Sequence, residues 1–326
     1  MWGVALGLSY RITLLDSLLR IVYMGTPDFA VPPLWALIEA GYSPVGVVTA
    51  PDRKSGRGQS LRPSAVKQVA QSEGIPVLEP ESLRDEAFVE ELEGLEVDVI
   101  VVVAFRILPS EVYTLAKKGA FNLHASLLPA FRGAAPIQRA LMAGVKNTGV
   151  TTFFLKSKVD TGDLILQEQI AVGPNETGGE LHDRLAELGA KAVVETVRSI
   201  EAGTADSTPQ NDALASAAPK IFKDDMQVDW SLPSKQVHNH IRALSPYPAA
   251  WTTHEGESLK LFRSVVLNDA LANAPLGAIL EAADRIVVAC GEGAVEVLEL
   301  QRGGKRRMNA ADFLNGYSLS IGDVLV

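Results

Sequence analysis

Disulfides, metal sites and membrane spans find little support in this sequence of 326 residues. Its single cysteine, Cys290, excludes a disulfide within the chain, and no cluster of cysteine and histidine has the spacing of metal ligands. No run of 18 or more apolar residues is present, so a membrane-spanning helix is not expected. We therefore predict a protein with no bound metal and no membrane partner.

The chain also lacks an excess of basic residues. It has 30 Lys and Arg against 39 Asp and Glu, which gives a formal net charge of −9. A protein with this charge has no overall attraction to nucleic acids or anionic lipids. Any nucleic-acid partner would have to be held by local basic clusters.

Two nucleotide-binding signatures are missing as well. The segment Gly25-Thr-Pro-Asp-Phe29 follows an apolar run, but it does not form G-x-G-x-x-G. No G-x-x-x-x-G-K-[ST] loop occurs anywhere in the chain. These absences argue against a dinucleotide-dependent enzyme and against a P-loop nucleotide enzyme.

The first 19 residues lack the features of a targeting segment. They are largely apolar, but they have no basic amino-terminal region and no small-residue cleavage site follows. We expect residues 1–19 to be an extension from an upstream start codon, with the functional chain beginning near Leu19 or Arg20. Without a recognisable leader, we expect a cytoplasmic protein.

Apolar strand-like runs alternate with helix-like segments from residue 20 to residue 203. The expected strands are residues 20–25, 45–49, 75–78, 97–104 and 119–124, followed by a hairpin of 148–155 and 164–172. The expected helices are residues 31–40, 64–73, 85–92, 109–118, 136–143 and 178–202. This alternation predicts an α/β fold with a doubly wound parallel sheet, in which ligands bind beyond the carboxyl ends of the strands.

The pattern changes after residue 203. Residues 204–221 are rich in Ala, Ser, Thr, Pro and Asp with little periodicity, so we predict a linker. In residues 222–326 one expected helix, 234–244, precedes several short strand-like runs, which suggests a small barrel or sandwich. We therefore expect a catalytic domain over residues 20–203 and a β-rich domain over residues 222–326.

Three polar side chains could act together on a carbonyl group. Asn122 and His124 are two residues apart on an expected strand, so their side chains share one face. Asp160 lies in an Asp160-Thr-Gly-Asp163 loop that could fold back onto them. An amide can stabilise an oxyanion, an imidazole can move a proton, and a carboxylate can fix the tautomer and charge of the imidazole. This set suits the transfer of an acyl group to an amine.

Each of the three also has a purely structural interpretation. A lone histidine near a strand end is commonly a structural hydrogen-bonding group. Asparagine before a loop is commonly a turn residue, and aspartate in D-T-G-D commonly closes a turn. Spacing alone leaves both interpretations open. The position of Asn122 and His124 at the carboxyl end of an expected parallel strand favours the catalytic one.

Two groups of basic residues occur in this acidic chain. The polar loop 51–63 contains Arg53, Lys54, Arg57 and Arg62. A glycine-containing turn near the C-terminus carries Arg302, Lys305, Arg306 and Arg307. Either group could be a solvated surface feature or a contact to a phosphate backbone.

Several motifs, taken in order, resemble the methionyl-tRNA formyltransferase family. They are Met24-Gly-Thr-Pro-Asp-Phe-Ala30, Pro51-Asp-Arg53, Gly56-Arg-Gly58, Asn122-Leu-His-Ala-Ser-Leu-Leu-Pro129, Arg132-Gly-Ala-Ala-Pro-Ile-Gln-Arg139, Asp160-Thr-Gly-Asp163, Asp229-Trp-Ser231, Ile241-Arg-Ala-Leu-Ser-Pro246 and Asp312-Phe-Leu-Asn-Gly316. The resemblance runs from about Arg20 to the C-terminus. One such motif would be weak evidence for the family, but this many motifs in the right order are a specific signal.

The resemblance implies a fold, an activity and a site. The fold would be a Rossmann-like formyltransferase domain followed by an OB-like barrel. The activity would transfer a formyl group from 10-formyltetrahydrofolate to the α-amine of methionyl initiator tRNA. The implied catalytic residues are Asn122, His124 and Asp160, the implied folate-binding loop is Ser126, Leu127, Leu128 and Pro129, and the implied tRNA contacts are Arg53, Arg57, Arg302, Lys305 and Arg306. We expect the protein to be a monomer.

One loop departs from the family's pattern. The segment Ala104-Phe-Arg-Ile-Leu-Pro109 is one residue shorter than usual, and the glycine that follows the aromatic residue in the family is missing. Glycine permits backbone conformations that other residues resist. Either Arg106 is tolerated at this edge of the folate site, or the pocket is altered.

Other activities use related chains. A formyltetrahydrofolate hydrolase would share the fold and the three polar residues but would use water as the acceptor. A glycinamide ribonucleotide transformylase would lack the C-terminal domain, and a sugar-amine formyltransferase would carry different loops. A non-catalytic RNA-binding module is disfavoured by the complete set of Asn122, His124 and Asp160.

Overall fold

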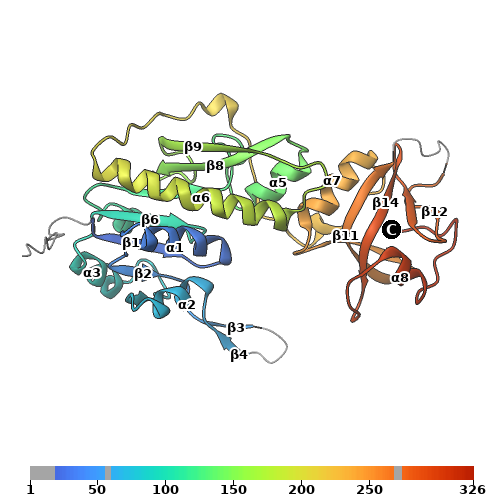
Figure 1. The fold of residues 1–326 in the computed structure, drawn as a ribbon, viewed down its shortest axis with the longest axis horizontal. Coiled ribbons are helices and arrows are strands. Elements are labelled where there is room, and N and C mark those ends of the chain that lie inside the picture. Colours follow the sequence, from blue (N-terminus) through green and yellow to red (C-terminus); the bar gives the residue numbers. More distant parts are fainter. Residues whose placement is uncertain (1–18, 56–59, 268–273) are drawn as a thin grey trace, which may run out of the picture.

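The computed structural model describes residues 19–55, 60–267 and 274–326. Figure 1 shows a larger domain with a central sheet and the long helix α6 (Gly178–Glu201), and a smaller, mostly β domain at the other end. The expected N-terminal extension lies outside the described residues except for Leu19, whose side chain is buried. The α/β fold class with a second, β-rich part is confirmed.

The larger domain is built on a seven-stranded sheet with the order β5-β2-β1-β6-β7-β8-β9. The first five strands run parallel, β8 is antiparallel to β7, and β9 is antiparallel to β8. The strands are β1 (Ile21–Gly25), β2 (Gly46–Val48), β5 (Val77–Leu78), β6 (Val99–Val103), β7 (Ala120–His124), β8 (Asn147–Phe154) and β9 (Leu164–Ala171). The predicted strands and hairpin are thus present. The central strands β1 and β6 are apolar throughout because both faces of a parallel sheet are buried.

Helices cover both faces of this sheet. Alternate residues of β1 enter two hydrophobic clusters: Ile21 and Tyr23 pack with helices α1, α2, α5 and α6, and Val22 and Met24 pack with α3 and α4. The helices other than α6 are α1 (Val31–Glu39), α2 (Ala65–Ser72), α3 (Glu86–Gly94), α4 (Ser110–Tyr113) and α5 (Pro136–Met142). The period-two alternation of a strand therefore creates the two helical layers.

The predicted helix 109–118 is wrong beyond its first turn, because α4 ends at Tyr113. The amides of Lys117 and Lys118 donate to the carbonyls of Val97 and Asp98, which precede β6. These bonds turn the chain so that β7 can pair with β6. Alignment of neighbouring strands overrides the helical pattern of the sequence at this point.

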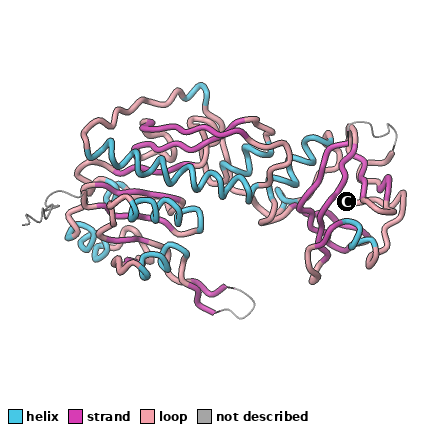
Figure 2. Tube along the Cα trace, in the orientation of Figure 1, coloured by secondary structure: helices cyan, strands magenta, loops and turns pink. Residues whose placement is uncertain are grey.

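The polar loop 51–63 contains regular structure that the sequence pattern did not predict. Strand β3 (Arg53–Ser55) pairs with β4 (Ser60–Arg62) in antiparallel register, with Arg53 opposite Arg62. Figure 2 shows this hairpin extending away from the body of the domain. The hairpin joins β2 to α2, so its two ends are fixed at the carboxyl edge of the sheet.

The smaller domain is a curled antiparallel sheet, a half-barrel consistent with an OB-like fold. Its strand order is β10-β11-β14-β13-β12, and β15 pairs with β14. The elements are α7 (Ser234–Leu244), β10 (Ala250–His254), β11 (Glu257–Leu267), β12 (Ile279–Glu281), β13 (Ile286–Ala289), β14 (Ala294–Arg302), β15 (Met308–Asn309) and α8 (Ala310–Leu314). Register shifts along the long β11–β14 ladder help the sheet to curl. Helix α7 matches its predicted range.

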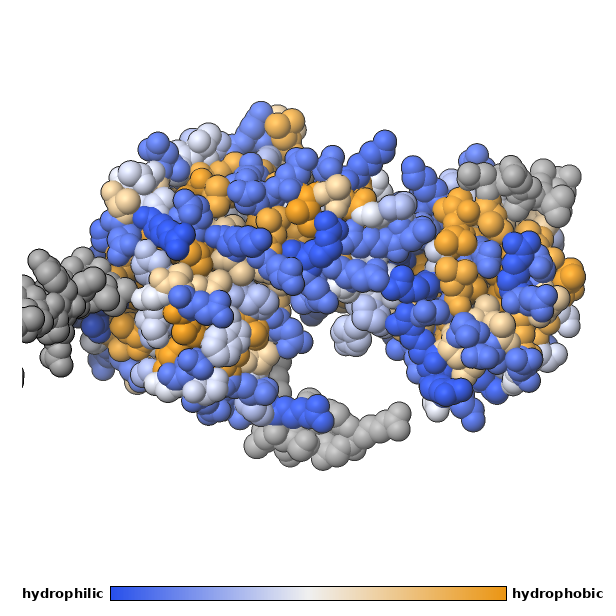
Figure 3. Space-filling model, viewed as in Figure 1, coloured by the Kyte–Doolittle hydropathy of each residue, from blue (hydrophilic) through white to orange (hydrophobic). Residues whose placement is uncertain are grey.

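Hydrogen bonds and an ion pair join the two domains. Arg242 on α7 is almost fully buried, and its Nη1 donates to the carbonyls of Gly173 and Glu176 at 3.0 and 3.2 Å. Glu180 on α6 forms an ion pair with Arg263 on β11. These contacts fix how the smaller domain is held beside α6, and Figure 3 shows an indentation between the domains on the side where the hairpin extends.

Candidate active site

A cavity of about 640 Å³ lies beyond the carboxyl ends of β6 and β7. Its walls come from the ends of these strands, from the loop after β6, from the segment 133–138 and from the loop between β8 and β9. Asn122, His124 and Asp160 all line it. The structure therefore brings together the three polar residues that the sequence singled out, although they come from two separate segments of the chain.

His124 has its two ring nitrogens in different environments. Its Nε2 lies 2.9 Å from the carbonyl oxygen of Phe131. A carbonyl can only accept, so we assign a hydrogen to Nε2, and in the neutral ring Nδ1 is then the free acceptor. Nδ1 lies 3.9 Å from Oδ2 of Asp160. Protonation of this ring would thus place a positive charge next to a carboxylate.

Asp160 is held by a backbone amide, by the side chain of Gln210 and by the conformation of its own loop. Its Oδ2 accepts from the amide of Gly133 at 2.8 Å, and its carbonyl accepts from Nε2 of Gln210 at 3.0 Å. Its φ of +54° lies in the left-handed region that non-glycine residues seldom adopt. A strained residue of this kind persists only when its surroundings fix it, and such residues concentrate at functional sites.

The loop after β7 positions the carbonyl that bonds to His124. Phe131 has a φ of +60°, and its amide donates to Oγ of Ser216 at 2.9 Å. Oγ of Ser126 donates to the carbonyl of Ala130 at 2.6 Å, and Thr151 donates to the carbonyl of Ser126. The orientation of the imidazole therefore depends on hydrogen bonds several residues away from it.

The residues implied as a folate-binding loop form the first part of this loop, directly after β7. Ser126 and Leu128 are buried, with Ser126 fully so. The backbone of Leu128 is bonded to side chains of β8 and β9: its amide donates to Thr151 and its carbonyl accepts from Gln167. Among the described residues that line the cavity, none belongs to the segment from Ser126 to Pro129. Their role in folate binding stays a prediction.

Arg106, the residue at the altered loop, lines the cavity and reaches across to a neighbouring loop. Its Nη2 and Nη1 donate to the carbonyls of Pro80 and Glu81 at 2.9 and 3.0 Å. The guanidinium also lies over the ring of Phe105, 5.2 Å from the centroid. Ala104 has a φ of +46°, so a non-glycine residue takes the unusual backbone conformation in this loop after β6.

Residues from the predicted linker complete the site, and sequence reasoning missed them. Gln210 donates to the carbonyls of Asp160 and Gly162, and its Oε1 accepts from Arg132. Arg132 also pairs with Asp212 at 2.7 Å. Arg132 belongs to one of the family's motifs, so a signal for it existed. Gln210 lies in a segment without periodicity, and nothing local in the sequence indicates its role.

The predicted RNA contacts near the C-terminus differ in their surroundings. Arg302 is paired with Glu257 at 2.5 Å and lies over the ring of Tyr317. Lys305 and Arg306 are exposed and have no ion-pair partner within the described parts of the chain. These two cations are therefore the ones left with uncompensated charge at this turn.

The basic hairpin and this turn extend toward the same side of the molecule. The Arg302 end of the β11–β14 ladder is opposite the end at which Leu267 pairs with Ala294. In Figure 1 the hairpin and this end of the ladder both reach the lower edge of the view. Arg53 belongs to strand β3, and Arg57 lies outside the described residues.

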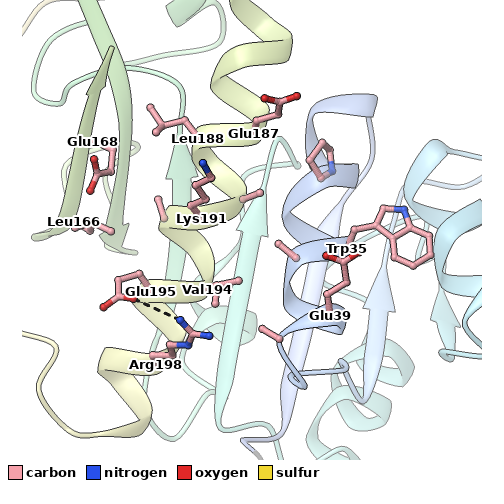
Figure 4. Close-up of a pocket in the computed structure, with 15 residues that line it drawn as sticks. Trp35, Glu39, Leu166, Glu168, Glu187, Leu188, Lys191, Val194, Glu195 and Arg198 are labelled. Carbon is pink, nitrogen blue, oxygen red and sulfur yellow. Dashed lines mark ion pairs between the residues drawn. The ribbon is translucent and has the colours of Figure 1, made fainter.

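A larger groove of about 890 Å³ lies away from the three polar residues, between α1, α6 and β9 (Figure 4). Glu39, Glu168, Glu187 and Glu195 line it together with only two cations, Lys191 and Arg198. An excess of carboxylates disfavours anionic ligands. Size alone therefore does not make this groove the better candidate for the site.

Membrane spans and metal clusters are both missing from residues 19–55, 60–267 and 274–326. Within them, no helix is long and apolar enough to cross a membrane. No group of three or more His, Cys, Asp or Glu side chains in the same residues is arranged to hold a metal ion. Cys290 is buried, and burial raises the pKa of its thiol to about 12.

Known proteins match both domains. The family "Formyl transferase" matches residues 19–197, and "Formyl transferase, C-terminal domain" matches residues 220–318. A sugar 3N-formyl transferase of known structure has a TM-score of 0.66 at 17% identity and covers 89% of this chain and 100% of its own. An N-formyltransferase from Helicobacter canadensis, solved with folinic acid and dTDP-3-aminofucose, has a TM-score of 0.65 at 18% identity, with 87% and 99% coverage. The fold is that of a formyl transferase with its C-terminal domain.

The names of curated relatives identify one family within the formyl transferases. Methionyl-tRNA formyltransferase of Parabacteroides distasonis is 49% identical over 311 residues, which are 92% of this chain and 96% of the relative. The protein of the same name from Symbiobacterium thermophilum is 46% identical over 308 residues, 94% of each chain. The chain belongs to the methionyl-tRNA formyltransferase family.

Proposed function

We propose that this protein transfers the formyl group of 10-formyltetrahydrofolate to the α-amine of methionyl initiator tRNA. The observation that carries the proposal is the meeting of Asn122, His124 and Asp160 at one cavity, in a chain whose curated relatives are named methionyl-tRNA formyltransferase. The basic hairpin and the exposed cations of the C-terminal turn give the chain surfaces that a small-molecule acceptor would not need.

The proposed chemistry uses the free nitrogen of His124. A neutral amine attacks the formyl carbon, and Nδ1 accepts the proton that the amine loses, because Nε2 already donates to Phe131. Asp160 stabilises the imidazolium that results. The amide of Asn122 donates to the formyl oxygen as negative charge develops on it. The bond between the formyl carbon and N10 of the folate then breaks, and the imidazolium returns its proton to that nitrogen.

The cavity suits a flat and partly apolar co-substrate. Its volume of about 640 Å³ falls within the usual range for small-molecule sites of about 300–1,000 Å³. Val102, Phe105 and Leu155 give it apolar walls, and Asn122 and His124 add polar groups at its base. We assign the folate to this cavity, with the segment from Ser126 to Pro129, in which Ser126 and Leu128 are buried, supporting the loop beside it.

The tRNA is proposed to bind along the indented side of the molecule. Arg53 and Arg57 of the hairpin segment and Arg302, Lys305 and Arg306 of the C-terminal turn are the proposed phosphate contacts. Local clusters of this kind can bind RNA in a protein of net charge −9, since phosphate contacts act at short range in salt. The exposed pair Lys305 and Arg306 should contribute most at the turn.

The deciding experiment supplies purified protein with 10-formyltetrahydrofolate, with and without methionyl initiator tRNA. We expect formyl transfer to the charged tRNA and little release of formate without it. Uncharged tRNA is the matched control, because it offers the same phosphates without the amine. Release of formate at the full rate without charged tRNA would indicate a hydrolase and would overturn the proposal.

A further inference from the structure

Lys67 on α2 connects two separate segments of the chain, one before β3 and one after β5. Its Nζ contacts Oδ2 of Asp52 at 2.9 Å and Oε2 of Glu79 at 2.7 Å. The lysine side chain is only 14% exposed. The other oxygens, Oδ1 of Asp52 and Oε1 of Glu79, are buried without a hydrogen-bond partner among the described residues. Lys67 is thus the described side chain that compensates both carboxylates.

The two carboxylates belong to functionally different segments. Asp52 directly precedes β3, so it forms the outgoing root of the basic hairpin. Glu79 follows β5, and the next two carbonyls, those of Pro80 and Glu81, accept from Arg106. Arg106 lines the cavity. Lys67 therefore lies between the root of the hairpin and the segment that holds one wall of the proposed folate site.

The returning root of the hairpin is fixed by different groups. Ser64 caps α2 by accepting from the amide of Lys67 at 3.0 Å. Its hydroxyl also shares a hydrogen bond of 2.8 Å with the hydroxyl of the fully buried Thr49. Because these contacts involve the backbone of Lys67 and not its ammonium, a change of the side chain should release the outgoing root and the Glu79 segment but leave the returning root in place.

We propose that Lys67 is a positioning residue for the tRNA substrate, because it holds the outgoing root of the basic hairpin at a fixed place beside the folate cavity. The proposal rests on the proposed function and deepens it. Lys67 itself touches neither substrate. It acts by setting where the hairpin starts, and thus where its cations meet the phosphates of the RNA.

The contacts predict an asymmetric effect of substitution. Lys67→Met keeps most of the side-chain length but leaves Asp52 and Glu79 close together without a cation, so the two carboxylates repel. Asp52→Asn releases the hairpin root alone, and Lys67 can keep its pair with Glu79. Glu79→Gln releases the cavity wall alone. The three variants therefore separate an effect on tRNA from an effect on folate.

The test measures initial rates while tRNA and folate are varied separately, with tRNA affinity from filter binding in parallel. Loss of one charged hydrogen bond predicts a rise of about 10-fold in the KM and Kd for tRNA in Lys67→Met and Asp52→Asn, with kcat and the folate KM changed less than about 3-fold in Asp52→Asn. Lys67→Arg should restore most of the tRNA affinity. The control is Lys117→Met, since Lys117 is exposed and 3.9 Å from its partner Glu96.

Two outcomes would overturn the proposal. One is a tRNA KM in Asp52→Asn equal to that of the unsubstituted protein. The other is an equal rise in the KM for tRNA and for folate in that variant, which would show general damage to the domain. Both outcomes require an active unsubstituted enzyme, so they differ from a failure of the proposed function, in which that enzyme itself would not formylate charged tRNA. Should Lys67→Met not fold, Asp52→Asn still decides.

Discussion

Nδ1 of His124 faces Oδ2 of Asp160 across 3.9 Å, while Nε2 of the same ring is bonded to the carbonyl of Phe131. The gap is longer than a direct hydrogen bond. A neutral imidazole at this position therefore keeps a free acceptor, and an imidazolium gains a carboxylate neighbour. Nδ1 of His124 is therefore free to accept a proton, because no hydrogen bond to Asp160 occupies it.

Removal of any of the three polar side chains should impair the chemical step. We expect Asn122→Ala, His124→Ala and Asp160→Ala each to lower kcat by at least about 100-fold, on the scale of losing one oxyanion donor. The measurement is single-turnover formylation with saturating folate and charged tRNA. Asn147→Ala, at an exposed position of β8, is the matched control and should retain activity. Near-normal turnover in all three variants would remove the proposed active site.

Gly133 should be essential to the position of Asp160. A Cβ at Gly133 would lie 2.4 Å from the carbonyl oxygen of Ala218, so its backbone would have to move, and with it the amide that bonds to Asp160. We expect Gly133→Ala to cost about 1–3 kcal/mol of stability by overpacking and to lower kcat. Chemical denaturation and formylation rates measure both effects.

Gly74→Ala serves as the control for this prediction. Gly74 also has a positive φ, +67°, but no atom lies within 4 Å of an added Cβ. It should lose about 1 kcal/mol from the left-handed backbone and keep its activity. If Gly133→Ala and Gly74→Ala were equally active, the proposed link from Gly133 to Asp160 would have no catalytic consequence.

Neutralising the proposed RNA-binding cations should affect one substrate only. We expect Arg57→Ala, and separately the double variant Lys305→Ala/Arg306→Ala, to weaken tRNA binding and leave folate affinity unchanged. The slope of log K against log salt should fall by roughly one for each phosphate that is no longer neutralised. Titrations at several salt concentrations measure this, with Lys117→Ala as the control. Equal reductions of tRNA and folate affinity would argue against both assignments.

Acid should weaken both the N-terminal cap of α6 and the interface between the domains through Glu180. Hydrogen bonds from the Thr177 backbone and then from Arg263 lower the pKa of this carboxyl from 4.5 to about 2. A pKa that is lower in the folded state stabilises folding above the unfolded value, and this stability is lost as pH falls from about 4.5 toward 2. Since the side chain is 46% exposed, solvent screening reduces the effect.

Thermal unfolding over this pH window tests the contribution of Glu180. We expect Glu180→Gln to show a smaller drop of Tm between about pH 4.5 and pH 2 than the unsubstituted protein, because it has no carboxyl to protonate. Glu73→Gln, at an exposed position after α2, should follow the unsubstituted protein. Identical curves for Glu180→Gln and the unsubstituted protein would show that the ionised carboxyl of Glu180 contributes no measurable stability through either Thr177 or Arg263.

Much of the fold could be predicted from local patterns. The apolar runs of β1 and β6 identify central parallel strands, because only a strand buried on both faces is apolar at every position. The helix expected over residues 234–244 coincides with α7. The short α4 was not, since the bonds that end it come from residues before β6.

In the candidate site, too, some residues could be named from the sequence and others could not. Asn122, His124 and Asp160 could be named because carboxamide, imidazole and carboxylate groups carry recognisable chemistry. The carbonyl of Phe131 and the amide of Gly133 could not, since every residue has these groups and only the folded backbone decides which ones reach the site. Gln210 gave no local signal for a similar reason: its partners are the carbonyls of Asp160 and Gly162.

The sequence by itself determined the layers of the sheet and the kinds of groups present, because side-chain periodicity and chemical identity are local properties of the chain. Tertiary structure alone decided which nitrogen of His124 is the free acceptor and which carboxylates share Lys67. Those relationships join segments that are distant in the chain, and their distances exist only after the sheet and its loops have packed.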